Sequence, residues 1–129
     1  MRALLDTNVA LFMWGDPGRL SPVVRNLLKS TDHQFLFSQV STWEICLKYR
    51  TGKLPLNGES PRDFLHKRIR QSELTYDAIS DAALFRSADL PSHHQDPFDR
   101  LLIATAQILD IPILTSDAAF HRYKVEVIW

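Results

Sequence analysis

Three short apolar runs, each passing directly into residues that favour the start of a helix, constrain the fold of this chain more than any other feature. The runs cover residues 2–6, 35–37 and 111–115, and they lead into Asp6-Thr7-Asn8, Ser38 and Ser116-Asp117. Short continuous apolar runs are typical of strands that are buried on both faces. Strands that alternate with helices form a parallel sheet with helices on both faces. We therefore expect an α/β fold in three layers, α/β/α, around a central parallel sheet.

The segments between these runs carry helical patterns. Apolar spacing and cap residues predict helices over residues 9–14, 22–28, 40–50, 61–70, 77–88 and 97–106, and a short helical piece over 118–123. Two further strands are expected at 74–75 and at 125–128, the latter at a sheet edge. Residues 9–14 are apolar on every face, which indicates either deep burial or an exposed face that another subunit covers.

The stretch Asp96-Pro97-Phe98-Asp99 opens the most apolar helix of the chain. Asp96 suits the N-cap, Pro97 suits the first helical position, and Asp99 stands where the acid of a capping box belongs. The residues that follow, up to Ala106, are almost all apolar. We therefore expect this helix to pack inside the domain and Asp99 to lie in a crevice at its start.

Composition limits the domain count and the partners. A chain of 129 residues predicts a single domain, residues 1–129, with a core large enough to fold without a disulfide or a structural metal, and Cys46 has no second cysteine to pair with. The 15 basic and 15 acidic residues cancel, so a nucleic acid would have to be held by a local basic patch or through metal ions. No signal peptide and no apolar run of membrane-spanning length is visible, which predicts a cytoplasmic protein without membrane contact.

Four acids are expected at one edge of the sheet. Asp6 and Asp117 directly follow strands, Glu44 lies early in the helix after the second strand, and Asp99 begins the helix that leads to the strand before Asp117. Each acid has a structural alternative, as a helix cap or, for Glu44, as the partner of Lys48 at i,i+4. Together they would repel one another unless cations bind or some carboxyls stay protonated. Carboxylate ligands without histidine or thiolate indicate Mg²⁺ or Mn²⁺.

The helix over 40–50 also defines how Glu44 is placed. Val40, Trp43 and Leu47 form its apolar stripe, which predicts that Glu44 lies at the border of the buried face.

Two groups of nitrogen-bearing side chains remain open. The helix from Pro61 carries the basic residues Arg62, His66, Lys67, Arg68 and Arg70, which form either a phosphate-contacting surface or a solvated face. The pair His93-His94 would suit a transition metal, but adjacent residues do not easily share one ion, and we do not expect a metal there.

These residues also resemble a known family, the PIN-domain ribonucleases, and in particular toxins of the VapC type from toxin–antitoxin pairs. The resemblance covers nearly the whole chain and rests on four motifs in order: Leu4-Leu5-Asp6-Thr7-Asn8, Ser41-Thr42-Trp43-Glu44-Ile45 with Lys48 and Gly52-Lys53-Leu54, Asp96 to Ala104, and Leu114-Thr115-Ser116-Asp117 with Phe120.

The resemblance implies a function and a site. Asp6, Glu44, Asp99 and Asp117 would be the catalytic, metal-binding acids, RNA the substrate and an antitoxin protein the partner. A homodimer is expected separately, from the apolar segment 9–14. The implied reaction is phosphodiester hydrolysis assisted by one or two Mg²⁺ or Mn²⁺ ions. Apart from the resemblance, Thr7, Asn8, Thr115 and Ser116 either orient the acids or serve as turn and cap residues, and Arg100 is a candidate RNA contact. Asp96 is an extra carboxylate near the site whose role the family pattern leaves open.

Two alternatives remain open at this point. The first is an RNA-binding or partner-binding domain that keeps the fold without turnover. The second is a receiver-type phospho-acceptor domain, which fits less well because Asp6 stands alone after the first strand and no acid directly ends the 35–37 strand. A dinucleotide-binding fold is excluded because no glycine-rich turn follows a strand.

Overall fold

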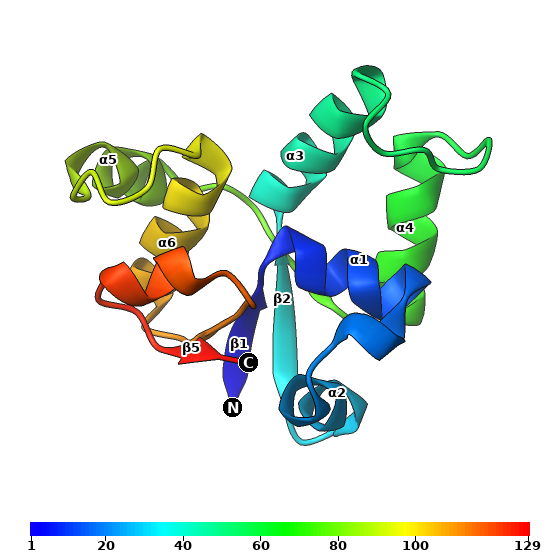
Figure 1. Ribbon diagram of the computed structural model, residues 1–129, viewed down its shortest axis with the longest axis horizontal. Coiled ribbons are helices and arrows are strands. Elements are labelled where there is room, and N and C mark those ends of the chain that lie inside the picture. The colour runs from blue at the N-terminus through cyan, green and yellow to red at the C-terminus, as the bar shows by residue number, and fades with distance from the viewer.

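A computed structural model describes residues 1–129 and contains one sheet of five parallel strands in the order β3-β2-β1-β4-β5 (Figure 1). The strands are β1 (Arg2–Leu5), β2 (Gln34–Ser38), β3 (Thr75–Asp77), β4 (Ile113–Leu114) and β5 (Val127–Ile128). In the central strand, Leu4 lies opposite Leu36 on one side and Ile113 on the other. The predicted parallel sheet, with its last strand at an edge, is confirmed.

Six α-helices and two 3-10 helices connect the strands. They are α1 (Thr7–Gly15), η1 (Pro17–Arg19), α2 (Pro22–Lys29), α3 (Gln39–Arg50), α4 (Pro61–Gln71), α5 (Asp81–Asp89), α6 (Pro97–Leu109) and η2 (Ala118–Arg122). The hydroxyls of Ser21, Ser60 and Ser80 each accept a hydrogen bond from the backbone N–H three residues later, as expected of N-caps. None of the helices combines the length and the apolar character that a membrane crossing requires.

Side chains of the central strands alternate between two cores on opposite faces of the sheet, as the pleat requires. One core joins strand residues to α1, α2 and α4 and contains Ala3, Leu5, Phe35, Phe37, Val9, Val24 and Leu65. The other joins the sheet to α6 and η2 and contains Leu4, Leu36, Ile113, Leu102, Ile103 and Phe120. Figure 1 shows α5 and α6 on one side of the sheet and α1, α2 and α4 on the other. These are the three layers that the sequence predicted.

The apolar segment 9–14 packs within the protein. Val9 and Ala10 are buried in the core beneath α1, and Leu11 to Trp14 are partly buried against the same core. The Trp14 ring lies 5.6 Å from the Phe37 ring, and its Nε1 donates a hydrogen bond to Ser72 Oγ at 2.8 Å. Deep burial is therefore observed for Val9 and Ala10, and the remaining residues of the segment are partly covered by the chain itself.

The predicted apolar stripe of α3 is wrong. Val40 is buried, but 45% of Trp43 and 36% of Leu47 are exposed, and Glu44 and Ile45 occupy the buried face instead. Trp43 instead packs against Phe98 of α6, with ring centroids 4.7 Å apart, and neither Trp43 nor Leu47 belongs to the two cores. Glu44 is thus fully inside the buried face of α3 and not at its border.

Two predicted boundaries also move because of tertiary pairing. Asp77, expected at the start of a helix, pairs with Ser38 as the last residue of β3, and α5 begins only at Asp81. The strand expected over 111–115 is reduced to Ile113–Leu114, because the Ile111 N–H closes the end of α6 and Pro112 has no N–H to donate.

Candidate active site

The carboxyl ends of β1 and β4 meet at the centre of the sheet, where the strand order changes direction. The Asp6 N–H donates to the Leu114 carbonyl at 3.0 Å, so the residues that follow both strands lie side by side. β2 passes into α3 at the same edge. Ligands of open parallel sheets bind at such a switch point.

Asp6 stands at the N-cap position of α1, but its side chain makes no capping hydrogen bond. The residue is only 6% exposed, and its Oδ2 accepts a hydrogen bond from Thr115 Oγ1 at 2.7 Å. The pKa of Asp6 is raised to about 6, mainly by burial; the charges of Glu44 and Asp117 contribute to the increase, while hydrogen bonds from the Thr115 hydroxyl and the Thr7 backbone oppose it. The carboxylate is held in the site and not used to start the helix.

Glu44 is buried, and its two oxygens have different surroundings. Oε2 lies 2.6 Å from Lys48 Nζ, so the i,i+4 pair considered from the sequence does form. Oε1 is buried without any hydrogen-bond partner. A buried carboxylate oxygen without a donor is costly, so Glu44 provides an oxygen that a cation would stabilise.

Asp96 and Asp99 make different contacts at the start of α6. Asp96 is the cap, since its Oδ1 accepts from the N–H groups of Phe98 and Asp99 at 2.8 and 3.2 Å. Asp99 does not complete a capping box; its Oδ2 lies 2.7 Å from His94 Nε2. The pKa of Asp99 is raised to about 7, mainly by burial; the charges of Asp6 and Asp96 contribute to the increase, and His94 opposes it.

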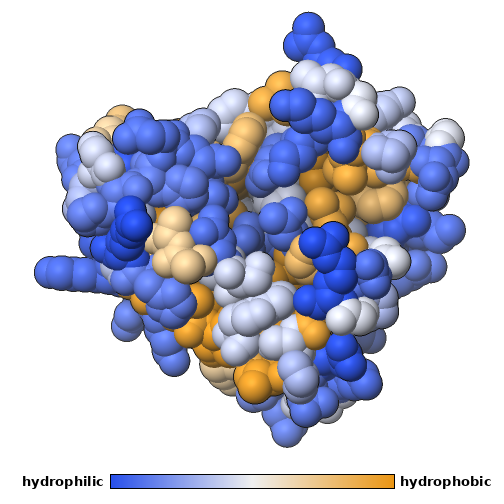
Figure 2. All heavy atoms as spheres, viewed as in Figure 1, coloured by the Kyte–Doolittle hydropathy of each residue, from blue (hydrophilic) through white to orange (hydrophobic).

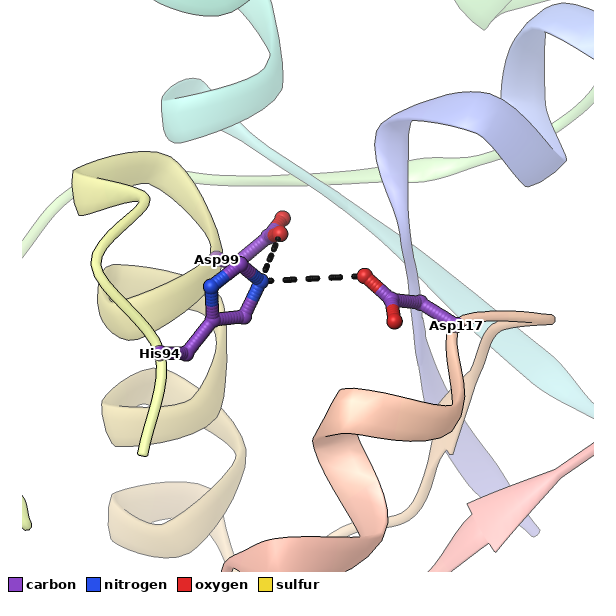
Figure 3. Close-up of side chains that lie close together, drawn as sticks. All are labelled: His94, Asp99 and Asp117. Atoms are coloured by element: carbon purple, nitrogen blue, oxygen red, sulfur yellow. Dashed lines mark hydrogen bonds and ion pairs between the residues drawn. The ribbon is translucent and has the colours of Figure 1, made fainter. Parts of the chain in front are cut away.

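Asp117 serves both as a cap and as a member of the site. Its Oδ1 accepts from the Ala119 N–H at 2.9 Å at the start of η2, and its Oδ2 lies 3.7 Å from His94 Nε2. Figure 3 shows the His94 ring between Asp99 of α6 and Asp117. One potential ligand atom from each of these three residues lies within 4.8 Å of the others.

His94 is the site residue that sequence reasoning missed. The histidine pair was considered only as a pair, whereas the structure separates its members: His93 packs against the Tyr123 ring at 5.3 Å, and His94 alone faces the acids. The available signal was the position of His94 five residues before Asp99, on the irregular segment that leads into α6.

The six residues predicted to support the acids differ in their placement. Thr115 contacts Asp6, and Thr7 shares a buried hydrogen bond of 2.7 Å with Ser41 of α3. Asp96 is a cap, whereas Asn8 and Ser116 are exposed.

The guanidinium of Arg100, the candidate RNA contact, is engaged within the protein. It donates to the backbone carbonyls of Ser87, Leu90, Pro91 and His94 at 2.7 to 3.3 Å. The side chain ties the end of α5 and the following segment to α6.

Two basic surfaces exist, and the sequence revealed only one of them. The first is a groove of about 670 Å³ between α3 and α4 that combines Arg62, His66 and Arg70 with the apolar side chains Cys46, Leu65 and Ile69. Figure 2 shows hydrophobic atoms gathered between these two helices. Arg68 of the predicted basic cluster pairs with Glu59 at 2.9 Å and lies over the Phe64 ring.

The second basic surface is a groove of about 620 Å³ whose lining includes Arg86, Arg122 and Lys124, with Asp89 as its one acid. These side chains come from α5, η2 and the residue after Tyr123, so only the fold brings them together. Tyr123 connects this groove to the acids, because its Oη accepts a hydrogen bond from the His94 N–H.

Comparison with known proteins places this geometry in a family. The model of the PIN domain family matches residues 3–126. No curated protein matches the sequence.

Three solved structures of toxin–antitoxin systems and related complexes share the fold. One is VapBC2 from Rickettsia felis bound to a DNA fragment from its promoter, with a TM-score of 0.75, 17% identity, and coverage of 99% of this chain and 98% of the other. A second is FitAcB from Neisseria gonorrhoeae, with a TM-score of 0.63, 23% identity, and coverage of 98% of this chain and 96% of the other. The third is VapBC-5 from Mycobacterium tuberculosis, a member of the VapBC family of toxin–antitoxin systems. It has a TM-score of 0.58 and 20% identity, with coverage of 98% of this chain and 97% of the other.

Proposed function

This chain belongs to the PIN domain family, and from that premise we propose that it is a divalent-metal-dependent endoribonuclease. PIN domains are generally nucleases. The observation that carries the proposal is the gathering of acids from four separate segments at one sheet edge, close enough that the charges of Glu44 and Asp117 raise the pKa of Asp6. The receiver-type alternative is set aside by the family match.

The residues present fit a divalent cation. Glu44 Oε1 is buried without a partner, and Asp6 is buried without acting as a cap. Oxygen-rich donor sets of this kind bind Mg²⁺ or Mn²⁺. We propose that Asp6, Glu44, Asp99 and Asp117 hold the ion.

When bound, the ion would supply a Lewis acid that activates the attacking water and neutralises charge on the phosphate. The chain itself would provide positioning. Thr115 orients Asp6, the shared hydrogen bond of Thr7 and Ser41 joins α1 to α3, and the Trp43–Phe98 contact joins α3 to α6. These contacts fix the elements that carry the acids relative to one another.

Because the chain has no net charge, RNA has to be attracted locally. The basic groove of Arg86, Arg122 and Lys124 is connected through Tyr123 to the acids, and we assign the RNA backbone to this groove.

The similar solved structures include toxin–antitoxin complexes, and we propose that this chain is the toxin of such a pair. The groove between α3 and α4 offers apolar and basic side chains together, which suits an acidic segment of an antitoxin that folds on binding. A homodimer is part of the same proposal. Co-expression with the product of the neighbouring reading frame, followed by light scattering of the purified material, tests both assemblies.

The direct test is incubation of the purified protein with single-stranded RNA in Mn²⁺ and in excess EDTA. Cleavage is expected with Mn²⁺ only. Asp99→Asn should lose most of the turnover, whereas the matched variant Asp32→Asn, on an exposed turn, should cleave like the wild type. Full activity in EDTA contradicts the metal mechanism, and RNA binding without cleavage supports the non-catalytic alternative.

A further inference from the structure

The backbone of His94 is fixed although it belongs to no helix or strand. Its N–H donates to Tyr123 Oη at 2.8 Å, and its carbonyl accepts from the Arg100 guanidinium at 3.3 Å. The same two side chains also donate to the Pro91 carbonyl, at 2.8 and 2.9 Å. These hydrogen bonds therefore hold the segment between α5 and α6 against Tyr123, which follows η2, and against α6. They fix the backbone that carries the His94 ring.

The surroundings of the ring determine where its proton lies. Nδ1 accepts a hydrogen bond from the Asp96 N–H at 3.4 Å. A backbone N–H can only donate, so the neutral tautomer that satisfies both contacts of the ring carries its proton on Nε2. Nε2 then donates to Asp99 Oδ2 at 2.7 Å (Figure 3).

Asp99 needs such a donor more than the other acids do. Its carboxylate is 15% exposed and is subject to repulsion from Asp6 and Asp96. Asp6 has the Thr115 hydroxyl, and Asp117 has the Ala119 N–H. For Asp99 the one side-chain donor in the structure is His94.

Building on the proposed function, the geometry points to His94 as a positioning residue of the metal centre, whose Nε2–H fixes Oδ2 of Asp99 and leaves Oδ1 for the ion. Ligating carboxylates are commonly oriented by a second hydrogen bond of this kind. Direct ligation by Nε2 is disfavoured here, because the proton would have to move to Nδ1, which faces the Asp96 N–H. His94 thus acts through Asp99 and does not bind the metal itself.

Three variants test this role by Mn²⁺ titration calorimetry. His94→Ala removes the donor and should weaken Mn²⁺ binding about 10- to 100-fold. His94→Gln places an amide N–H near the position of Nε2 and should restore affinity to within about threefold of the wild type. His93→Ala, whose ring packs on Tyr123 away from the acids, should bind Mn²⁺ like the wild type.

A spectroscopic measurement separates positioning from ligation. In pulsed electron paramagnetic resonance of the Mn²⁺-loaded wild type, a positioning role predicts no ¹⁴N coupling of the size produced by a directly bound imidazole. A coupling of that size, abolished in His94→Ala, overturns the inference. Unchanged or tighter Mn²⁺ binding by His94→Ala overturns it as well, as does a glutamine variant as weak as the alanine variant.

The outcomes also distinguish this inference from the proposed function. If the wild type binds Mn²⁺ with the expected variant pattern but does not cleave RNA, the positioning role stands and the nuclease proposal fails. If the wild type binds no Mn²⁺, both fail. Melting curves in EDTA confirm that each variant is folded, and the glutamine variant keeps the test decisive where the alanine variant is not.

Discussion

Asp6 and Asp96 stand at the same position relative to a helix, directly before its first turn, yet only Asp96 uses its carboxylate as a cap. The difference lies in their surroundings. Asp96 is partly exposed beside two free N–H groups, whereas Asp6 is buried against Thr115 and near Glu44 and Asp117. A buried acid facing other acids destabilises the metal-free protein, and this cost gives each site residue a measurable signature.

Asp6→Asn provides that signature in melting curves. In EDTA the variant should be as stable as the wild type or more stable, because a like-charge cost is removed. With Mn²⁺ the order should reverse: the wild type gains about 2.7 kcal/mol at a hundredfold excess over Kd, a shift of several degrees, and the variant gains much less. Equal metal-induced shifts in the two proteins would show that Asp6 is not a ligand.

Thr115→Val tests the hydroxyl that holds Asp6. The substitution preserves shape but removes the donor to Asp6 and the acceptor of the Asp117 N–H. At pH 8 in EDTA we expect unfolding in urea to require about 1–3 kcal/mol less free energy, and Mn²⁺ affinity to fall. Thr105→Val is the control, since its buried hydroxyl bonds to the Leu101 carbonyl within α6. An effect on Mn²⁺ binding equal to that of the control would contradict the assigned role.

At the scale of elements, most of the fold could be predicted because each strand–helix junction carries its own local signal. Ser21, Ser60 and Asp96 cap the helices that were predicted to begin directly after them. Ser80 caps α5 at a position that the prediction had placed inside the helix. The errors occurred where a distant partner decides. Asp77 joins β3 because Ser38 is there to pair with it.

The candidate site was predictable to a similar degree and for a related reason. Parallel topology by itself brings strand ends together, so the acids that follow strands could be grouped from the sequence. His94 could not, because its position depends on an irregular segment held by Arg100 and Tyr123. Likewise, Glu44 is buried while Trp43 of the same helix packs against Phe98, a tertiary contact that the residue spacing along α3 does not reveal.

Arg100→Lys tests the segment between α5 and α6 as an element. A lysine cannot reproduce a fork that donates to four carbonyls. We expect a loss of about 1–3 kcal/mol in unfolding free energy and faster amide hydrogen exchange over residues 91–95. Arg86→Lys, which loses one exposed bond to Gln107, should change neither. Unchanged exchange in Arg100→Lys would show that the segment is held by other contacts.

At the scale of the whole molecule, the charges cancel in number but are separated in space. The four candidate site acids lie at the sheet edge, whereas basic side chains line two grooves. The grooves can be told apart in an Asp99→Asn background, which we expect to bind RNA without cutting it. Arg122→Ala with Lys124→Ala should weaken RNA binding and reduce the salt slope by about 2. Arg62→Ala with Arg70→Ala should leave both largely unchanged, and the opposite pattern would exchange the two assignments.

The stability of the whole domain should also depend on pH in a direction that metal reverses. The pKa of Asp6 in the folded protein is raised to about 6 and that of Asp99 to about 7. The folded protein therefore binds protons at these two carboxylates more tightly than the unfolded chain does. Their stabilising contribution is therefore complete below about pH 4 and is lost as pH rises through 6 and 7. For Asp6 alone the loss is on the order of 3 kcal/mol.

Urea unfolding at pH 5 and pH 8 measures this dependence. In EDTA these two groups should make the protein less stable at pH 8, and the difference should shrink in Asp6→Asn. With saturating Mn²⁺ the pH dependence of stability should reverse, because only ionised carboxylates bind the cation. At pH 8 the carboxylates repel one another most in the metal-free protein, and at the same pH they bind the ion best. A metal-free wild type more stable at pH 8 than at pH 5, with Asp6→Asn showing the same change, would mean that these acids do not face one another in solution.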